Sequence, residues 1–180
     1  YPFKPLGLHD LLTWGAFTYP VAFFITDITN RRYGPQKARW IVFAGFIVAV
    51  FLSIWFATPR IAIASGTAFL TAQLIDVTIF SKLRNSKWWK APLISSSIGS
   101  VIDTIIFFSI AFSASFVFFG SNDDFALSQI SFFGMDFIQV PRWFSWAVGD
   151  LVVKFIVALA LLFPFAMIRN KIGVWKEFKI

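Results

Sequence analysis

The sequence predicts an all-α integral membrane protein, a compact bundle of six transmembrane helices of which this chain covers five. Apolar residues make up 58% of the 180 residues and charged residues only 14%, whereas soluble domains carry about 25% charged residues. Phenylalanine occurs 25 times and tryptophan 8 times, and a soluble fold of this length has too little interior to bury so much aromatic surface. The mean hydropathy of +0.74 agrees with helices that face lipid.

Five apolar segments are long enough to cross a bilayer, which takes roughly 20 mostly apolar residues in a helix. Residues 58–60 alone separate the second segment from the third, and this predicts a tight helical hairpin. We expect residues 1–180 to form a single transmembrane domain. Its predicted spans are residues 11–29, 39–57, 61–80, 92–119 and 143–168.

Basic residues alternate between the loops and predict the orientation of the chain. Residues 31–39, 82–90 and 169–179 each hold four of the 16 lysines and arginines. Short loops rich in these residues stay in the cytoplasm, so all three segments, and the carboxyl terminus with them, are predicted to be cytoplasmic. The visible start then lies outside, which predicts one more helix upstream. We therefore expect a multi-pass membrane protein with both ends in the cytoplasm.

The long loop over residues 120–142 combines acidic residues, such as Asp123 and Asp124, with several aromatic ones. This pattern predicts an outer cap or a shallow re-entrant segment, because irregular backbone at membrane depth must be buried in protein. A loop without fixed structure is the alternative.

Five ionisable residues interrupt the apolar segments. A charge in hydrocarbon is costly, so such residues face a cavity, a partner or a ligand. They predict a polar pathway inside the bundle. These residues are Asp27, Asp76, Asp103, Asp150 and Lys154.

The fourth span holds the densest polar pattern. Ser96, Ser100 and Thr104 recur every four residues and share one helix face. Close helix packing explains small residues at this spacing equally well, but it does not explain Asp103. That carboxylate lies roughly 16 Å from the cytoplasmic end of its helix, near the midplane where transporter sites tend to lie.

The third and fifth spans each carry a polar pair. Asp150 and Lys154 are four residues apart on one face. Two pairings are open. Lys154 could pair with Asp150 within its own helix, and the ion pair would then serve only helix packing. Lys154 could instead pair with Asp103 across the bundle, which would leave Asp150 facing a cavity.

Gln73 and Asp76 are three residues apart and also share a face. Asp76 lies at a depth close to that of Asp27. The two carboxylates form an inner gate, or else they reach out to the interface.

Five motifs occur in an order that is specific when they are taken together. They are DITNRRYG at residues 27–34, SGTAF at 65–69, QLID at 73–76, SSSIGSVIDT at 95–104 and GD at 149–150. In this order they resemble the queuosine precursor transporter family, earlier grouped as vitamin uptake transporters, over nearly the whole chain.

The resemblance implies a six-helix inner-membrane protein. Its fold would be similar to the substrate-binding subunits of energy-coupling-factor vitamin transporters. It further implies import of 7-cyano-7-deazaguanine and 7-aminomethyl-7-deazaguanine, which are salvaged for the modification of transfer RNA.

A ligand of this kind suits the polar residues of the spans. A guanine edge presents an N–H and an amino group side by side, and one carboxylate can accept both hydrogen bonds. We expect Asp103 to bind this edge with Gln73 nearby, and Asp150 with Lys154 to set the charge balance. Asp76 and Asn30 are second choices as binding residues.

Other classes of function are less favoured. The chain has no cysteine and a single histidine, His9, so no metal site and no cofactor are expected. An intramembrane enzyme is a less favoured alternative, because no nucleophile–base pair or phosphate loop is present. A vitamin-binding subunit of an energy-coupling-factor transporter is the nearer alternative. The expected partners are a small deazapurine and the lipid bilayer, with no nucleic acid, and so thin a bundle is compatible with a homodimer.

Overall fold

Long helices lie side by side in the computed structural model, which describes residues 15–132 and 135–174, with the side chains of residues 135 and 136 left aside. Residues 11–14 of the first predicted span, and His9, lie outside the described residues. Four helices are long and apolar enough to cross a membrane within the described part of the chain, which confirms the all-α membrane bundle. They are α1 (Gly15–Phe56), α2 (Pro59–Leu83), α3 (Lys90–Phe112) and α5 (Arg142–Arg169).

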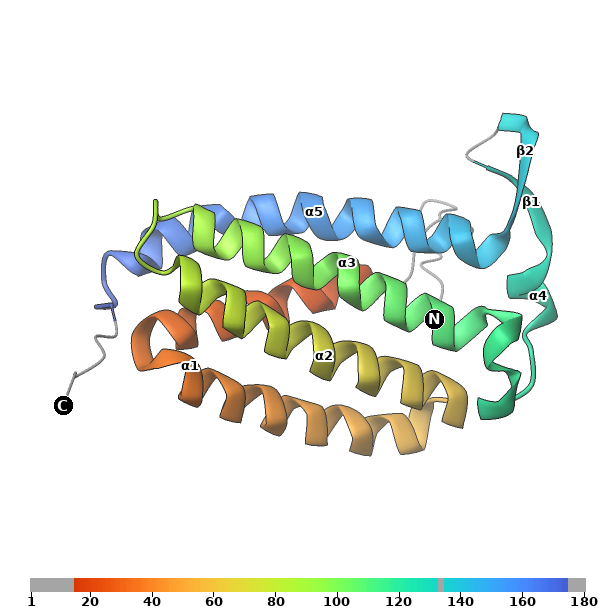
Figure 1. Cartoon of the computed structure of the whole chain (residues 1–180), viewed down its shortest axis with the longest axis horizontal. Helices are drawn as coiled ribbons and strands as arrows, with labels where there is room; N and C mark the ends of the chain where they lie inside the picture. Colours follow the sequence, from red (N-terminus) through yellow and green to blue (C-terminus); the bar gives the residue numbers. More distant parts are fainter. Residues whose placement is uncertain (1–14, 133–134, 175–180) are drawn as a thin grey trace.

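The first of these, α1, is two helices joined at a sharp bend. Gly34 has φ 85° and ψ 173°, a conformation that glycine adopts far more readily than other residues. Pro35 follows, and proline suits the first position of a helix because it has no N–H to leave unpaired. The two arms, residues 15–33 and 35–56, therefore correspond to the first two predicted spans, so that five helical segments make up the bundle (Figure 1).

A tight turn links α1 to α2, as the sequence predicts. The Thr58 side chain accepts a hydrogen bond from the Ile61 N–H at 3.4 Å, and Pro59 opens the helix. The second arm of α1 thus runs antiparallel to α2 and packs mainly through Val42 and Val77.

The predicted segment 92–119 is divided in the structure. Helix α3 ends at Phe112, and a 3₁₀ helix, η2 (Ala114–Phe119), follows it. Ser113 has an extended backbone, and its hydroxyl accepts from the Ser115 N–H at 3.4 Å, which starts the new turn. Hydropathy alone could not locate this boundary, because both parts are equally apolar.

Residues 114–132 and 135–141 form a folded cap on one end of the bundle, which we call the cap end. After η2 come the short helix α4 (Asp124–Leu127) and an antiparallel hairpin of β1 (Gln129–Phe132) and β2 (Met135–Pro141). Asp123 caps α4 by accepting from the Phe125 and Ala126 N–H groups. The hairpin was not among the expectations from sequence.

Arg60 fastens this cap to the bundle from the start of α2, where its side chain is buried. Its guanidinium donates to the Ile110 carbonyl at 2.8 Å and to the Ser113 carbonyl at 2.5 Å, both at the end of α3. It also donates to the Gly120 carbonyl and to Asn122 in the cap. A cation at a helix carboxyl end is favoured by the helix dipole.

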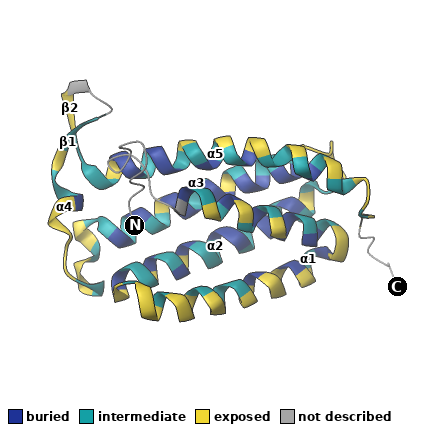
Figure 2. Ribbon diagram, turned by 180° about the vertical axis from the view of Figure 1, so that it is seen from behind, coloured by how far each residue is buried: buried dark blue, intermediate teal, exposed yellow. Residues whose placement is uncertain are grey.

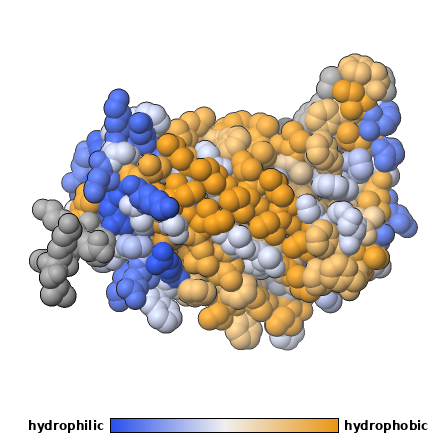
Figure 3. All heavy atoms as spheres, viewed as in Figure 1, coloured by the Kyte–Doolittle hydropathy of each residue, from blue (hydrophilic) through white to orange (hydrophobic). Residues whose placement is uncertain are grey.

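Burial and hydropathy follow the pattern of a bundle in lipid. In Figure 2 the buried residues face the inside of the bundle, and exposed ones gather on the outer sides of α1 and α5. Figure 3 shows a hydrophobic band around the middle and hydrophilic atoms at the end near the carboxyl terminus. That end holds the bend of α1, the α2–α3 loop and the last turn of α5. We call it the basic end.

Gly99 allows the first arm of α1 to approach α3 closely. A Cβ atom at this position would lie 2.7 Å from the ring of Phe23 and 3.5 Å from the Ala72 carbonyl oxygen. The glycine in the fourth span is therefore explained by this contact, which sits between the two polar clusters described next.

Candidate substrate site

A buried triad of charges joins α3 to α5. The Lys154 ammonium lies 2.6 Å from Asp103 Oδ2 and 2.5 Å from Asp150 Oδ2, so that both pairings expected from sequence occur together. Thr104 donates to Asp150 Oδ2 at 2.9 Å and lies 3.2 Å from the ammonium. All three charged residues are at most 3% exposed. The triad carries a formal net charge of minus one and links the two helices.

The first arm of α1 closes the triad on a third side. The Lys154 ammonium lies 5.1 Å from the centre of the Tyr19 ring, a cation–π contact. The same ring packs edge-on against Phe69 of α2 at 6.2 Å. Tyr19 therefore connects the triad to α2, and the cation meets carboxylates on two sides and an aromatic ring on another.

Several buried polar atoms around the triad have no hydrogen-bond partner. Oδ1 of Asp103 is one of them, although Oδ2 of the same carboxylate binds Lys154. Both side-chain amide atoms of Gln73 and the hydroxyl of Ser100 are also unpaired, and both side chains are only 1% exposed. An unpaired buried polar atom costs about 1–3 kcal/mol. This unused capacity for hydrogen bonds marks a place where a polar ligand could bind.

Aromatic residues lie next to the triad on its cap side. Phe108 follows Thr104 by four residues on α3, and Trp146 precedes Asp150 by four on α5, so each shares a face with its neighbour. Phe108 and Trp146 pack in one buried cluster with Ala126 of the cap. The Trp146 indole N–H is buried without an acceptor.

A second polar cluster lies about 10 Å closer to the basic end along α3. The carboxyl groups of Asp27 and Asp76 face each other there and are 2% and 0% exposed. Ser96 donates to Asp27 Oδ2 at 3.3 Å, and Ser95 to Asp27 Oδ1 at 3.5 Å. Neither oxygen of Asp76 meets a well-oriented donor. We call Asp27 and Asp76 the carboxyl pair.

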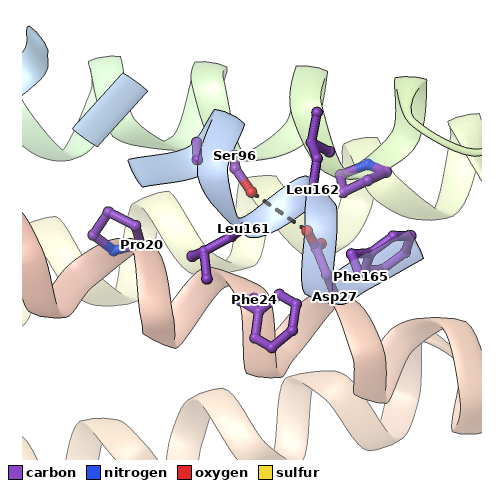
Figure 4. Close-up of a pocket in the computed structure, with 9 residues that line it drawn as sticks. Pro20, Phe24, Asp27, Ser96, Leu161, Leu162 and Phe165 are labelled. Atoms are coloured by element: carbon purple, nitrogen blue, oxygen red, sulfur yellow. Dashed lines mark hydrogen bonds between the residues drawn. The ribbon is translucent and has the colours of Figure 1, made fainter. Parts of the chain in front are cut away.

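A narrow cleft between α1, α3 and α5 reaches Asp27 of this pair. Figure 4 shows Asp27 with its hydrogen bond from Ser96 at the polar side of the cleft, and apolar side chains around it. The apolar lining comes from Pro20 and Phe24 of α1, Pro92 of α3, and Ala158, Leu161, Leu162 and Phe165 of α5. The cleft thus adjoins the carboxyl pair.

Asn30 is engaged by protein groups. Its amide donates to the Val77 carbonyl at 2.9 Å and to the Ser81 hydroxyl at 3.1 Å, and its oxygen accepts from Arg84. This network ties the first arm of α1 to the basic end of α2. Asn30 lies beyond the carboxyl pair as seen from the triad.

The structure thus distributes the residues singled out by sequence over three sets. Asp103, Asp150 and Lys154 meet in the triad, Asp76 meets Asp27, and Asn30 meets Arg84. Gln73 lies one turn from Asp76 on α2 with its amide unpaired. Tyr19 and Trp146, which lie beside the triad, were not selected as site residues. The four-residue spacing of Trp146, Asp150 and Lys154 could have identified the tryptophan.

Comparisons with known proteins agree on one family. A family model described as "Putative vitamin uptake transporter" matches residues 13–58 and 53–168. The chain is similar to the "Queuosine precursor transporter" of Escherichia coli, with 32% identity over 91% of this chain and 74% of the relative. No solved structure matches significantly.

Two further relatives match over shorter stretches. A "Probable queuosine precursor transporter" of Haemophilus influenzae is 40% identical over 56% of this chain and 52% of its own length. One from Bacillus subtilis with the same name is 29% identical over 56% of both chains.

Proposed function

The chain belongs to the vitamin uptake transporter family, and from this premise we propose that it imports the queuosine precursors 7-cyano-7-deazaguanine and 7-aminomethyl-7-deazaguanine. It is a multi-pass membrane transporter and not an enzyme. The names of its relatives support queuosine precursors as the substrate class. The choice of these two bases, and inward transport, are the finer parts of the proposal.

One observation carries the assignment of the site, namely the unpaired hydrogen-bonding atoms beside the triad. A deazaguanine offers N–H and amino donors on one edge and a carbonyl acceptor next to them. Oδ1 of Asp103 can accept from that edge, and the Gln73 amide can both donate and accept. Binding the base would therefore satisfy groups that the folded protein leaves unpaired.

The surroundings suit the rest of the ligand. Stacking of a base on an aromatic side chain is worth about 1–3 kcal/mol, and Phe108 and Trp146 lie in the aromatic cluster next to the triad. The net negative charge of the triad also favours a cationic aminomethyl group. In this proposal Asp150 and Lys154 hold Asp103 in place and adjust the charge that the substrate meets.

The distribution of basic residues supports a particular orientation of the protein in the membrane. Residues 31–39, 82–90 and 169–171 lie around the basic end, and we place this end in the cytoplasm by the positive-inside rule. The cap end then faces the outside of a bacterial inner membrane. A fluorescent protein that matures only in the cytoplasm, fused to the carboxyl terminus, should be bright, and a dark fusion in intact membranes would reverse the orientation.

The decisive experiment is uptake by a bacterial strain that cannot synthesise queuosine precursors and carries this protein as its sole transporter for them. Wild-type protein should restore queuosine in transfer RNA when either base is supplied. Asp103→Asn should abolish the restoration, while Asp124→Asn, an equivalent change on the exposed cap, should not. If Asp103→Asn restores queuosine as well as the wild type does, the assigned site is wrong.

Binding separates this function from its nearest alternative. The purified protein should bind the deazaguanines in preference to vitamins such as riboflavin or biotin. Tight binding of a vitamin, together with co-purification of an ATPase, would instead favour a vitamin-binding subunit of an energy-coupling-factor transporter.

A further inference from the structure

The carboxyl pair has no role in the substrate site as proposed, since Asp103 and Gln73 supply the contacts to the base. Yet Asp27 and Asp76 are as deeply buried as the triad. Carboxylates within a membrane bundle are costly to maintain, and for that reason they mark ion or proton pathways. The pair therefore calls for a separate explanation.

The charged and polar neighbours of the pair can be named element by element. α1 contributes Asp27 and α2 contributes Asp76, and neither forms an ion pair with a lysine or arginine of the described residues. From α3 the neighbours are the hydroxyls of Ser95 and Ser96. From α5 only apolar side chains line the cleft beside Asp27. On this helix Lys154 is already bound to Asp103 and Asp150 in the triad.

This arrangement lacks one positive charge. Two carboxylates that face each other in a water-poor interior repel strongly, and such pairs elsewhere hold a single proton between them. The two serine hydroxyls donate to Asp27 and leave Asp76 without a well-oriented donor. A proton bound to one carboxyl would supply the missing donor and remove the repulsion. A metal cation fits less well, because hard cations take six or more oxygen ligands.

A second observation connects the pair to the substrate. The Gln73 amide and the Ser100 hydroxyl are almost fully buried and unpaired. Gln73 precedes Asp76 by three residues on one face of α2, and Ser100 follows Ser96 by four on one face of α3. These unpaired groups therefore lie between the pair and the triad. A base bound by Gln73 would rest one helical turn from Asp76.

We propose that Asp27 and Asp76 share one proton and that this proton crosses the membrane together with each substrate molecule. This inference rests on the proposed import function. The proton binds to a carboxylate oxygen of the pair while the site is open to the outside. After the substrate leaves, the O–H bond breaks and the proton passes to water at the basic end.

Reconstituted transport tests the coupling. Proteoliposomes with the full chain are loaded with alkaline buffer, and accumulation of 7-aminomethyl-7-deazaguanine is measured at set external pH values. With the membrane potential held at zero, one proton per uncharged substrate gives about a tenfold higher ratio of inside to outside concentration for each pH unit. The uncharged 7-cyano-7-deazaguanine is therefore measured in parallel. Accumulation that ignores the pH difference, or that follows a sodium gradient instead, would overturn the proposal.

Variants of the pair should lose coupling and keep binding. Asp27→Asn and Asp76→Asn should still exchange labelled for unlabelled substrate, but their accumulation ratio should fall to about one at any pH difference. Asp124→Asn should accumulate substrate like the wild type. If the accumulation ratio of both pair variants still rises tenfold per pH unit, the pair does not couple the proton to transport.

A measurement without substrate keeps the two proposals separable. Infrared spectra of the purified protein at neutral pH should contain a protonated-carboxyl band that is lost in Asp76→Asn or Asp27→Asn and kept in Asp124→Asn. If the band is present but no deazaguanine is transported, the proposed function fails while the shared proton stands. If the base is transported and no such band exists, the shared proton is refuted on its own.

Discussion

The triad and the carboxyl pair are two solutions to the same problem, the burial of carboxylates within a helical bundle. In the triad, Lys154 lies within 2.6 Å of two carboxylates, and Thr104 completes the contacts. In the pair, two carboxylates face each other with only serine hydroxyls as donors. The triad contains its own counter-ion, whereas the pair depends on a charge that comes from elsewhere.

The two clusters therefore differ in how the negative charge of their carboxylates is neutralised: permanently in the triad, and by a cation that can leave in the pair. A lysine cannot leave its site, so the triad fixes α3 against α5 and presents a constant charge to any ligand. A pair without a lysine or arginine can gain and lose a small cation as its exposure changes. One bundle can therefore hold a rigid recognition site and an ion-binding site only about 10 Å apart along α3.

The largest effect should come from removing the cation of the triad. Lys154→Met leaves Asp103 and Asp150 buried without their counter-ion, and breaking a buried ion pair in this way typically costs about 3–5 kcal/mol. The free energy of unfolding in detergent, followed by circular dichroism against denaturant, should fall by that amount. Adding Asp150→Asn should recover part of the loss, because one buried carboxylate then remains. If Lys154→Met is as stable as the wild type, Lys154 is not an essential counter-ion, and the triad does not differ from the pair in the way argued above.

Within the triad, the two aspartates should differ in function more than in stability. Asp103→Asn and Asp150→Asn each leave one carboxylate with Lys154, so both should fold. Oδ1 of Asp103 is the buried, unpaired oxygen that we assign to the base, and a hydrogen bond to a charged group is worth about 1.5–3 kcal/mol. Affinity for 7-aminomethyl-7-deazaguanine, measured by calorimetry, should therefore fall roughly tenfold to hundredfold in Asp103→Asn and much less in Asp150→Asn. Equal losses would mean that the triad acts only as a unit.

Much of this architecture could be predicted from hydropathy and helix periodicity, and some could not. Spacing along one helix placed Asp150 and Lys154 on one face, but it could not decide which aspartate Lys154 binds, because that depends on the distance between helices. In the structure α3 and α5 lie close enough for both contacts. The meeting of Asp27 with Asp76 likewise depends on how the first arm of α1 packs, and Gly99 with its contact to Phe23 controls that packing.

The cap was the part of the fold that sequence described least well. Its aromatic residues suggested burial in protein, but the boundary at Ser113 and the β-hairpin depend on local hydrogen bonds rather than on periodicity. Arg60 is the clearest example. The sequence shows it as a lone basic residue in a tight turn, and only the structure reveals that it binds carbonyl groups of α3 and of the cap.

Gln73 tests whether the substrate occupies the space between the clusters. Its amide has no partner in the folded protein, so Gln73→Met should leave stability unchanged or raise it by up to about 1 kcal/mol. Affinity for the deazaguanine should nevertheless fall about fivefold, the equivalent of one ordinary hydrogen bond. A variant that binds the base normally would place the ligand outside the region between the triad and the pair.

Asp76→Asn should change stability only slightly, and this is what distinguishes the pair from the triad. The amide is nearly the same shape, it removes the like-charge repulsion, and it can donate to Asp27 as a protonated carboxyl would. We expect the free energy of unfolding to change by less than about 1 kcal/mol, against several for Lys154→Met. Asp76→Leu keeps the branched shape but is larger and removes the donor, so it should cost more than Asp76→Asn by at least about one hydrogen bond. If Asp76→Asn is instead as damaging as Lys154→Met, both carboxylates are ionised and held by a bound cation, and exchangeable neutralisation by a proton does not describe this site.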